Sequence, residues 1–137
     1  MYTNNRDAYR QAFFTVWQKY QKKLPLEPVE AQLVEIIDLH PEYHPLLGKP
    51  DSYQNQEFTT EENPFLHMSL HIALREQIRT NRPAGVAAIY ADLIEKYVHT
   101  HEVEHRMMEC LSQIIWSAQQ TGVMSSEEYY LEKLKRI

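Results

Sequence analysis

Residues 99–109, a stretch with helical periodicity, contain three histidines and three glutamates. His101, His105 and Glu109 recur every four residues, so a helix would align them in one stripe along a single face. Imidazole with some carboxylate suits zinc, iron, nickel or manganese, and ligand type alone does not choose among these divalent transition metals. The same periodicity places Glu104 among apolar neighbours, where a carboxylate must be ion-paired, protonated or bound to metal. The stretch therefore predicts half of a metal site.

Two protease-like motifs overlap in this stretch. His101 to His105 matches HExxH, in which Glu102 would be the general base beside a zinc-bound water. It also matches the inverse order, HxxEH, in which Glu104 takes that role. Helical periodicity directs Glu102 toward water, where its charge suits the first turn of a helix, and directs Glu104 inward. The sequence therefore favours Glu104 over Glu102, while a third interpretation, a site shared by bundle helices, requires a partner helix.

A second pair with one-turn spacing, His67 and His71, provides that helix. On a helical wheel the pair shares a flank with Leu74 rather than with Arg75, so both imidazoles are expected to face the core. One buried histidine is usually explained by a hydrogen bond to a carbonyl or an acid, but four would need four such sets of partners, and one ion satisfies them together. The predicted metal ligands or their acceptors are His67, His71, His101, Glu104, His105 and Glu109.

A third pair, His40 and His44, is interrupted by Pro41 and Pro45. Residues that precede proline avoid the helical conformation, so these two imidazoles need not point in one direction. Two interpretations stay open: a capping turn with solvated histidines, and a role for His44 as an extra ligand or proton relay. If a bound ion kept an open coordination position, Glu104 or His44 would be the candidate catalytic residue that moves the proton.

The elements that must position these residues are helices. The chain has only three glycines and no sustained alternation of polar and apolar residues, so the sequence predicts an all-α fold. We expect a compact bundle of about five to six helices, forming a single domain over residues 1–137, with a polar loop at about 48–62. A first helix from about Asn5 to Lys23 would bury Tyr9, Phe13, Trp17 and Tyr20, with N-caps expected at Asn63, Thr100 and Ser125 and C-cap Gly122.

Composition excludes some classes of partner. A formal charge of −5 argues against nucleic acid or an anionic membrane as the main partner, because both require a basic surface. The chain has no run of 18 apolar residues and a polar start, so we expect a cytoplasmic protein. The one cysteine, Cys110, suits a reducing compartment and is interpreted as a packing residue. A protein partner and the oligomeric state, including a homo-oligomer, are left open.

Several linked blocks of the sequence, residues 39–44, 63–71, 75–77, 81–83 and 104–111, together resemble DUF1841, a small bacterial family of unknown function. The resemblance spans nearly the whole chain and implies a bacterial origin but no activity. In the family pattern the central motif is HxxEH, which matches His101, Glu104 and His105, and no acid is required at the position of Glu102. Histidine pairs on bundle helices are also similar to those of haemerythrin-like proteins, a likeness that does not transfer function.

Three functions remain open at this point. If the site keeps an open coordination position, the protein would be a metal-dependent hydrolase or oxidoreductase. If the ligands close the site, it would be a non-catalytic metal-binding module. Without a metal, it would be a helical protein-interaction module with structural histidines.

Overall fold

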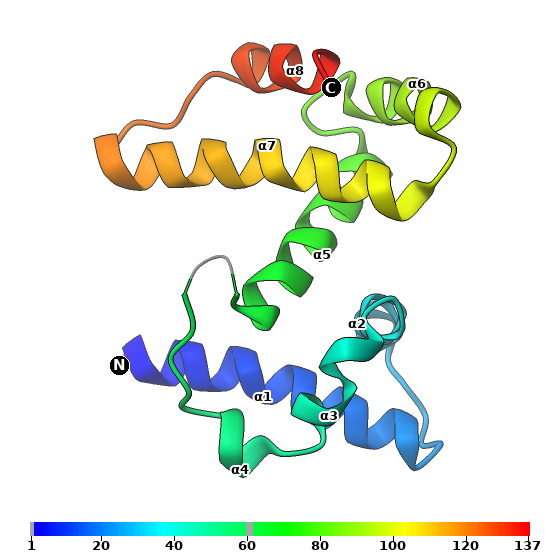
Figure 1. The fold of residues 1–137 in the computed structure, drawn as a ribbon, viewed down its shortest axis with the longest axis vertical. Coiled ribbons are helices and arrows are strands. Elements are labelled where there is room, and N and C mark those ends of the chain that lie inside the picture. The colour runs from blue at the N-terminus through cyan, green and yellow to red at the C-terminus, as the bar shows by residue number, and fades with distance from the viewer. Residues whose placement is uncertain (1, 60–61) are drawn as a thin grey trace. The chain divides into compact units, whose positions relative to one another are not determined.

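The computed structural model describes residues 2–59 and 62–137, the side chains of residues 2–6 excepted, and this part of the chain is all-α without a strand (Figure 1). The all-α prediction is therefore confirmed. The helices are α1 Tyr2–Gln21, α2 Pro28–Asp38, α3 His44–Leu47, α4 Pro50–Tyr53, α5 Pro64–Thr80, α6 Val86–Tyr97, α7 Thr100–Thr121 and α8 Glu127–Lys135, with a 3₁₀ turn at Pro41–Tyr43.

The predicted number of helices is too low. The described residues form eight α-helices where five to six were expected, and the additional ones are α3 and α4. Each has four residues with proline at its first or second position, but the sequence analysis placed Pro45 in a turn and Pro50 in the polar loop. Residues 60 and 61 of the predicted polar loop lie outside the described residues.

Contacts divide the chain into two compact units, one ending at Ser69 and the other beginning at Leu70, so that the boundary falls within α5. The single-domain expectation stays a prediction. In the first unit α1 packs on α2 and α3. In the second unit α7 packs on α6 and α8, as the upper part of Figure 1 shows.

The buried face of α1 differs from the prediction at two of four positions. Phe13 and Trp17 are buried as expected, but Tyr9 and Tyr20 are 39% and 41% exposed, and Phe14 is buried instead. The phenol groups explain the difference, because a hydroxyl at the edge of the core can reach a polar partner. The Tyr9 hydroxyl donates to the carbonyl of Phe65 at 2.8 Å.

Arg10 anchors the described part of the predicted polar loop. Its guanidinium is buried, with 4% of the residue exposed, and Nη1 donates to the carbonyls of Tyr53, Gln54 and Gln56 at 3.2, 3.1 and 2.8 Å. The guanidinium also lies 4.8 Å from the centre of the Phe65 ring. A buried charge needs such partners, and backbone oxygens at the end of α4 supply them.

The core of the second unit includes an apolar stripe along α7. Val103, Met107, Leu111 and Ile114 recur at intervals of three or four residues and are all buried. They pack with residues from α5, α6 and α8, namely Leu74, Val86, Ile89, Leu93, Tyr130 and Leu134.

Helix ends in the structure agree with the sequence at two positions and correct it at two. The Asn63 side chain accepts from the backbone N–H of Phe65 at 3.0 Å, and Gly122 ends α7 with a left-handed φ of 75°, both as predicted. The N-cap of α7 is His99 rather than Thr100, and it makes no capping hydrogen bond with its side chain. The last helix is capped by Ser126 instead of Ser125, through a hydrogen bond from the backbone N–H of Tyr129 at 3.1 Å.

A partly buried hydrogen bond links helix α8 to α5. The Tyr130 hydroxyl donates to Oε1 of Gln77 at 2.7 Å, and burial raises the pKa of this phenol above its usual value. Replacing Tyr130 by phenylalanine leaves the Gln77 oxygen without this donor.

We expect Tyr130→Phe to lower the free energy of unfolding by about 0.5–1.5 kcal/mol, the usual net contribution of one hydrogen bond. Chemical denaturation followed by helical circular dichroism measures this change. The exposed Tyr129 gives the matched control, since Tyr129→Phe should leave stability nearly unchanged. Equal stabilities for the two variants would contradict the assigned role.

Candidate metal centre

A buried imidazole and a buried carboxylate meet between α5 and α7 within the second unit. His71 is fully buried on α5, and its Nδ1 lies 3.2 Å from Oε1 of Glu104 on α7. Because an ionised carboxylate only accepts hydrogen bonds, Nδ1 of His71 carries the proton and donates. In a neutral His71 ring this leaves the lone pair on Nε2.

Arg75, one turn after His71 on α5, fixes the other side of the same carboxylate. Its Nε donates to Oε1 of Glu104 at 2.8 Å and its Nη2 to Oε2 at 3.0 Å, a bidentate pair. Burial by itself would raise the pKa of Glu104, but the hydrogen bonds from His71 and Arg75 outweigh it and lower the pKa to about 2. The carboxylate is therefore ionised at neutral pH and suits an orienting role better than that of a general base, which needs a pKa near the working pH.

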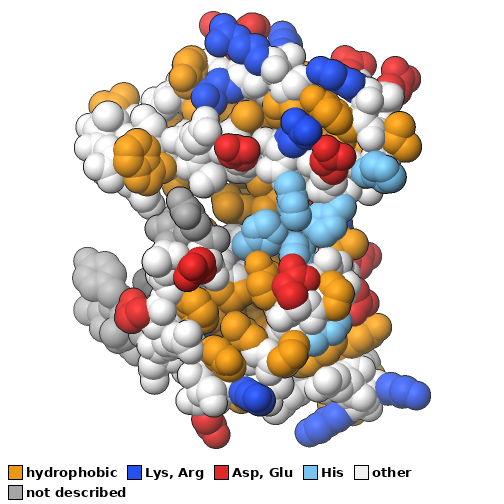
Figure 2. All heavy atoms as spheres, viewed as in Figure 1, with side chains coloured by type: hydrophobic (Ala, Val, Ile, Leu, Met, Phe, Trp, Pro, Cys, Tyr) orange, Lys and Arg blue, Asp and Glu red, His pale blue; other side chains and the backbone are white. Residues whose placement is uncertain are grey.

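Two further imidazoles of α7 surround the His71 ring. Nε2 of His105 lies 3.1 Å from Nε2 of His71, and the centre of the His101 ring lies 4.2 Å from that of His105 and 5.3 Å from that of His71. Three imidazoles of the second unit thus gather beside the Glu104 carboxylate. His105 is exposed, and Figure 2 shows histidine side chains forming part of the molecular surface.

The distance between the two Nε2 atoms fits one of two arrangements. In the first, His105 carries the proton on Nε2 and donates an N–H···N hydrogen bond to His71. In the second, both lone pairs bind one ion, because two nitrogens about 2.0–2.1 Å from the same ion lie about 2.8–3.0 Å apart in octahedral geometry and about 3.3–3.4 Å apart in tetrahedral geometry. The arrangement of His71 between a carboxylate and a second imidazole matches the usual surroundings of a metal-bound histidine.

The first unit contains a second imidazole pair with the same arrangement. Nδ1 of His40 lies 2.8 Å from the carbonyl oxygen of Ile36, to which it donates, and Nε2 of His40 lies 3.0 Å from Nε2 of His67 on α5. His40 is 1% exposed. In each pair, one imidazole donates its Nδ1 proton to an oxygen atom, and its Nε2 faces the second imidazole.

His44 lies away from this contact, with its own partners. Its Nε2 donates to the carbonyl of Ile37 at 2.9 Å, and its ring lies 4.4 Å from that of Trp17. This corrects the expectation of solvated histidines in the turn, since His40 is buried and His44 is bonded to the backbone. The proposed relay role of His44 stays a prediction.

The six predicted site residues fall into different places. His71, His101, Glu104 and His105 come together in the second unit, and His67 meets His40 in the first. Glu109 lies one turn beyond His105 on α7 and is exposed, so its role as ligand or acceptor stays a prediction. The preference for HxxEH agrees with the structure, since Glu102 is exposed and accepts from Arg106 at 3.0 Å.

Sequence reasoning missed two residues of these sites. Arg75 was assigned to the solvent side, yet it reaches Glu104, and its signal was the one-turn spacing from His71 on the same helix. His40 was left as a turn residue because Pro41 follows it. Its signal was the position four residues after Ile36, which continues the buried stripe of α2 to the end of the helix.

The fold and the site define an all-helical protein with histidines that could hold a metal ion. The nitrogen ligands on offer are His40 and His67 in the first unit and His71 and His105 in the second. Searches of curated proteins and of solved structures gave no significant match. A family model described as a domain of unknown function, DUF1841, matches residues 5–136, and the chain belongs to this family. None of the described helices is long and apolar enough to cross a membrane.

Removing the charge of Glu104 should destabilise the second unit. Glu104→Gln keeps the size of the side chain but loses the ion pair with Arg75 and one acceptor for the His71 proton. We expect a loss of about 1–3 kcal/mol in the free energy of unfolding, measured in the presence of a chelator so that metal does not contribute. The exposed Glu102 provides the control, because Glu102→Gln removes only a surface ion pair of about 0–1 kcal/mol.

The contribution of Glu104 should also depend on pH in a defined direction. Its pKa in the folded state is lowered to about 2 from an ordinary value of 4.5, so ionised Glu104 stabilises the folded state fully above pH 4.5. This contribution is lost as the pH falls toward 2. The difference in unfolding free energy between wild type and Glu104→Gln should therefore shrink as the pH falls from 4.5 toward 2, and a difference that grows over this range would contradict the assignment.

Proposed function

We propose that the protein binds a divalent transition metal through His71, His101 and His105, with Glu104 as the acceptor that orients His71. The observation that carries the proposal is the 3.1 Å separation of the His71 and His105 Nε2 atoms, combined with the Nδ1 hydrogen bond to Glu104. That hydrogen bond selects the tautomer in which Nε2 can bind an ion. Imidazole ligands favour zinc or iron, with nickel and manganese as further candidates.

The exposure of His105 supports an ion that solvent can reach. Catalytic metal sites keep a coordination position open to solvent, whereas structural sites are closed by four protein ligands. An ion held there would supply activation of water or dioxygen, the chemistry of a hydrolase or an oxidoreductase. The residues of this chain would hold the ion and fix the His71 ring, while Arg75 keeps Glu104 ionised.

The pair of His40 and His67 supports metal binding in the first unit as well. The Nδ1 hydrogen bond to the Ile36 carbonyl leaves Nε2 of His40 as a ligand, and Nε2 of His67 lies within the distance that two ligands of one ion require. That His67 and His71 share one ion remains the prediction drawn from their one-turn spacing on α5.

The proposal predicts metal that depends on these histidines. Untagged protein purified without chelator should contain zinc or iron at a near-stoichiometric level by inductively coupled plasma mass spectrometry. His105→Ala should lose that metal while retaining its helical circular dichroism, because His105 is exposed and contributes little to the core. Glu104→Gln should bind metal about 10–100-fold more weakly, the usual loss when the acceptor of a metal-bound histidine is removed.

His99→Ala is the matched control, since His99 is an exposed histidine six residues earlier that caps α7 only through its backbone. It should keep the metal. The His67→Ala variant then counts the sites, because loss of all metal indicates one shared ion and loss of part of it indicates two. A protein that takes up neither zinc nor iron after loading would overturn the proposal, and the N–H···N hydrogen bond would then account for each pair.

A further inference from the structure

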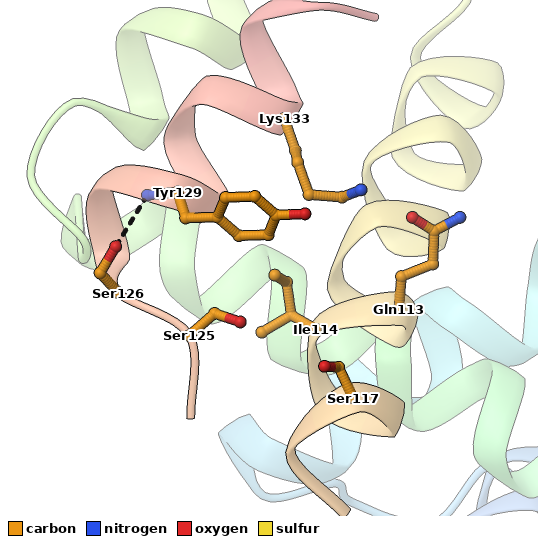
Figure 3. A pocket seen from close by; sticks show the side chains of 7 residues that line it. All are labelled: Gln113, Ile114, Ser117, Ser125, Ser126, Tyr129 and Lys133. Carbon is orange, nitrogen blue, oxygen red and sulfur yellow. Dashed lines mark hydrogen bonds between the residues drawn. The ribbon is translucent and has the colours of Figure 1, made fainter. Parts of the chain in front are cut away.

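A cavity of about 350 Å³ with polar and apolar walls lies between α7 and α8 in the second unit, where no residue of the metal centre takes part (Figure 3). Its size is at the small end of the range for ligand pockets in proteins. Helix α7 contributes residues one turn apart, and the connection to α8 and the first turns of α8 close the other side. The lining residues are Gln113, Ile114, Ser117, Ser125, Ser126, Tyr129 and Lys133.

Lys133 supplies the one cationic group of this lining. Figure 3 shows its side chain extending from α8 across the cavity toward Gln113 on α7. No ion pair is recorded for its ammonium group with any carboxylate in the described part of the chain, and its recorded contact is with the Tyr129 ring at 5.6 Å. A charged group at the wall of a cavity is favourably placed for a ligand of opposite charge.

The other polar groups are neutral and can both donate and accept. The hydroxyls of Ser117, Ser125 and Tyr129 point toward the cavity in Figure 3. Ser126 differs from them because its hydroxyl oxygen accepts from the backbone N–H of Tyr129 and so caps α8. The Ile114 side chain, buried in the core of this unit, presents carbon atoms between these hydroxyls.

We propose that this cavity binds a small hydroxylated monocarboxylate. The single ammonium group of Lys133 balances one negative charge, which a monocarboxylate carries, and leaves the second charge of a phosphate dianion without a cationic partner in this lining. Hydroxyl and amide groups match the hydroxyls of a ligand, which also donate and accept, and the side chains of Ile114 and Tyr129 cover its carbon chain. This site is independent of the metal centre and adds a second ligand class to the protein.

The test uses the full chain and three probes: gluconate, glucose and acetate. Gluconate should cause saturable chemical-shift changes of the backbone amides in α7 and α8. A titration observed by nuclear magnetic resonance measures these changes. Glucose has the hydroxyls without the charge and acetate has the charge without the hydroxyls, so each should bind at least about tenfold more weakly, a loss equivalent to one charge-assisted hydrogen bond.

Lys133→Met removes the charge and keeps the length of the side chain, and it should weaken gluconate binding by about tenfold or more. Lys135→Met is the matched control, because Lys135 lies on the same helix, pairs with Glu132 at 3.5 Å and does not line the cavity. Ser117→Ala should weaken gluconate while leaving acetate unchanged. The proposal is overturned if gluconate shifts no α7 or α8 amide, if it binds no better than glucose, or if both lysine variants weaken it equally.

Discussion

The ionised carboxylate of Glu104 is the interaction on which the second unit depends. It lies on the apolar side of α7, where a charge is stable only with partners, and it receives one hydrogen bond from His71 and two from Arg75. Both partners belong to α5, one turn apart. The polar contact therefore fixes the rotation of α5 against α7, while the apolar stripe of α7 supplies most of the burial. Replacement of any one member leaves a buried charge or donor with fewer partners.

The same carboxylate determines the tautomer of His71. An imidazole that donates through Nδ1 has its lone pair at Nε2, so the position of a proton on one ring atom determines whether the other atom can bind an ion. A backbone carbonyl, instead of a carboxylate, accepts the Nδ1 proton of His40 and leaves the lone pair of that ring at Nε2 as well. A carbonyl is a weaker acceptor than a carboxylate, so the two pairs differ in the basicity of the ligand that they offer. The pair beside Glu104 is for this reason the stronger candidate for a catalytic ion.

Helical periodicity was sufficient to predict much of this arrangement. The stripe of α7, the inward direction of Glu104 and the outward direction of Glu102 follow from spacing alone, and the structure agrees with all three. Spacing does not show how far a long side chain reaches, so Arg75 was assigned to solvent although its guanidinium turns back to Glu104. It also places Pro41 and Pro45 in a turn and Pro50 in a polar loop, which hid α3, α4 and the burial of His40. These errors concern side-chain reach and short helices, which depend on tertiary contacts.

The way Arg10 holds the segment after α4 has a consequence for how freely that segment can change. Its guanidinium donates to three backbone oxygens of this segment, which every amino acid carries. Side chains at 54 and 56 can therefore be exchanged without loss of this anchor, provided the backbone keeps its path. The residue that cannot be exchanged is Arg10 itself, more than forty positions earlier in the chain. The path of this segment thus depends on its backbone and on one arginine side chain far from it in the sequence.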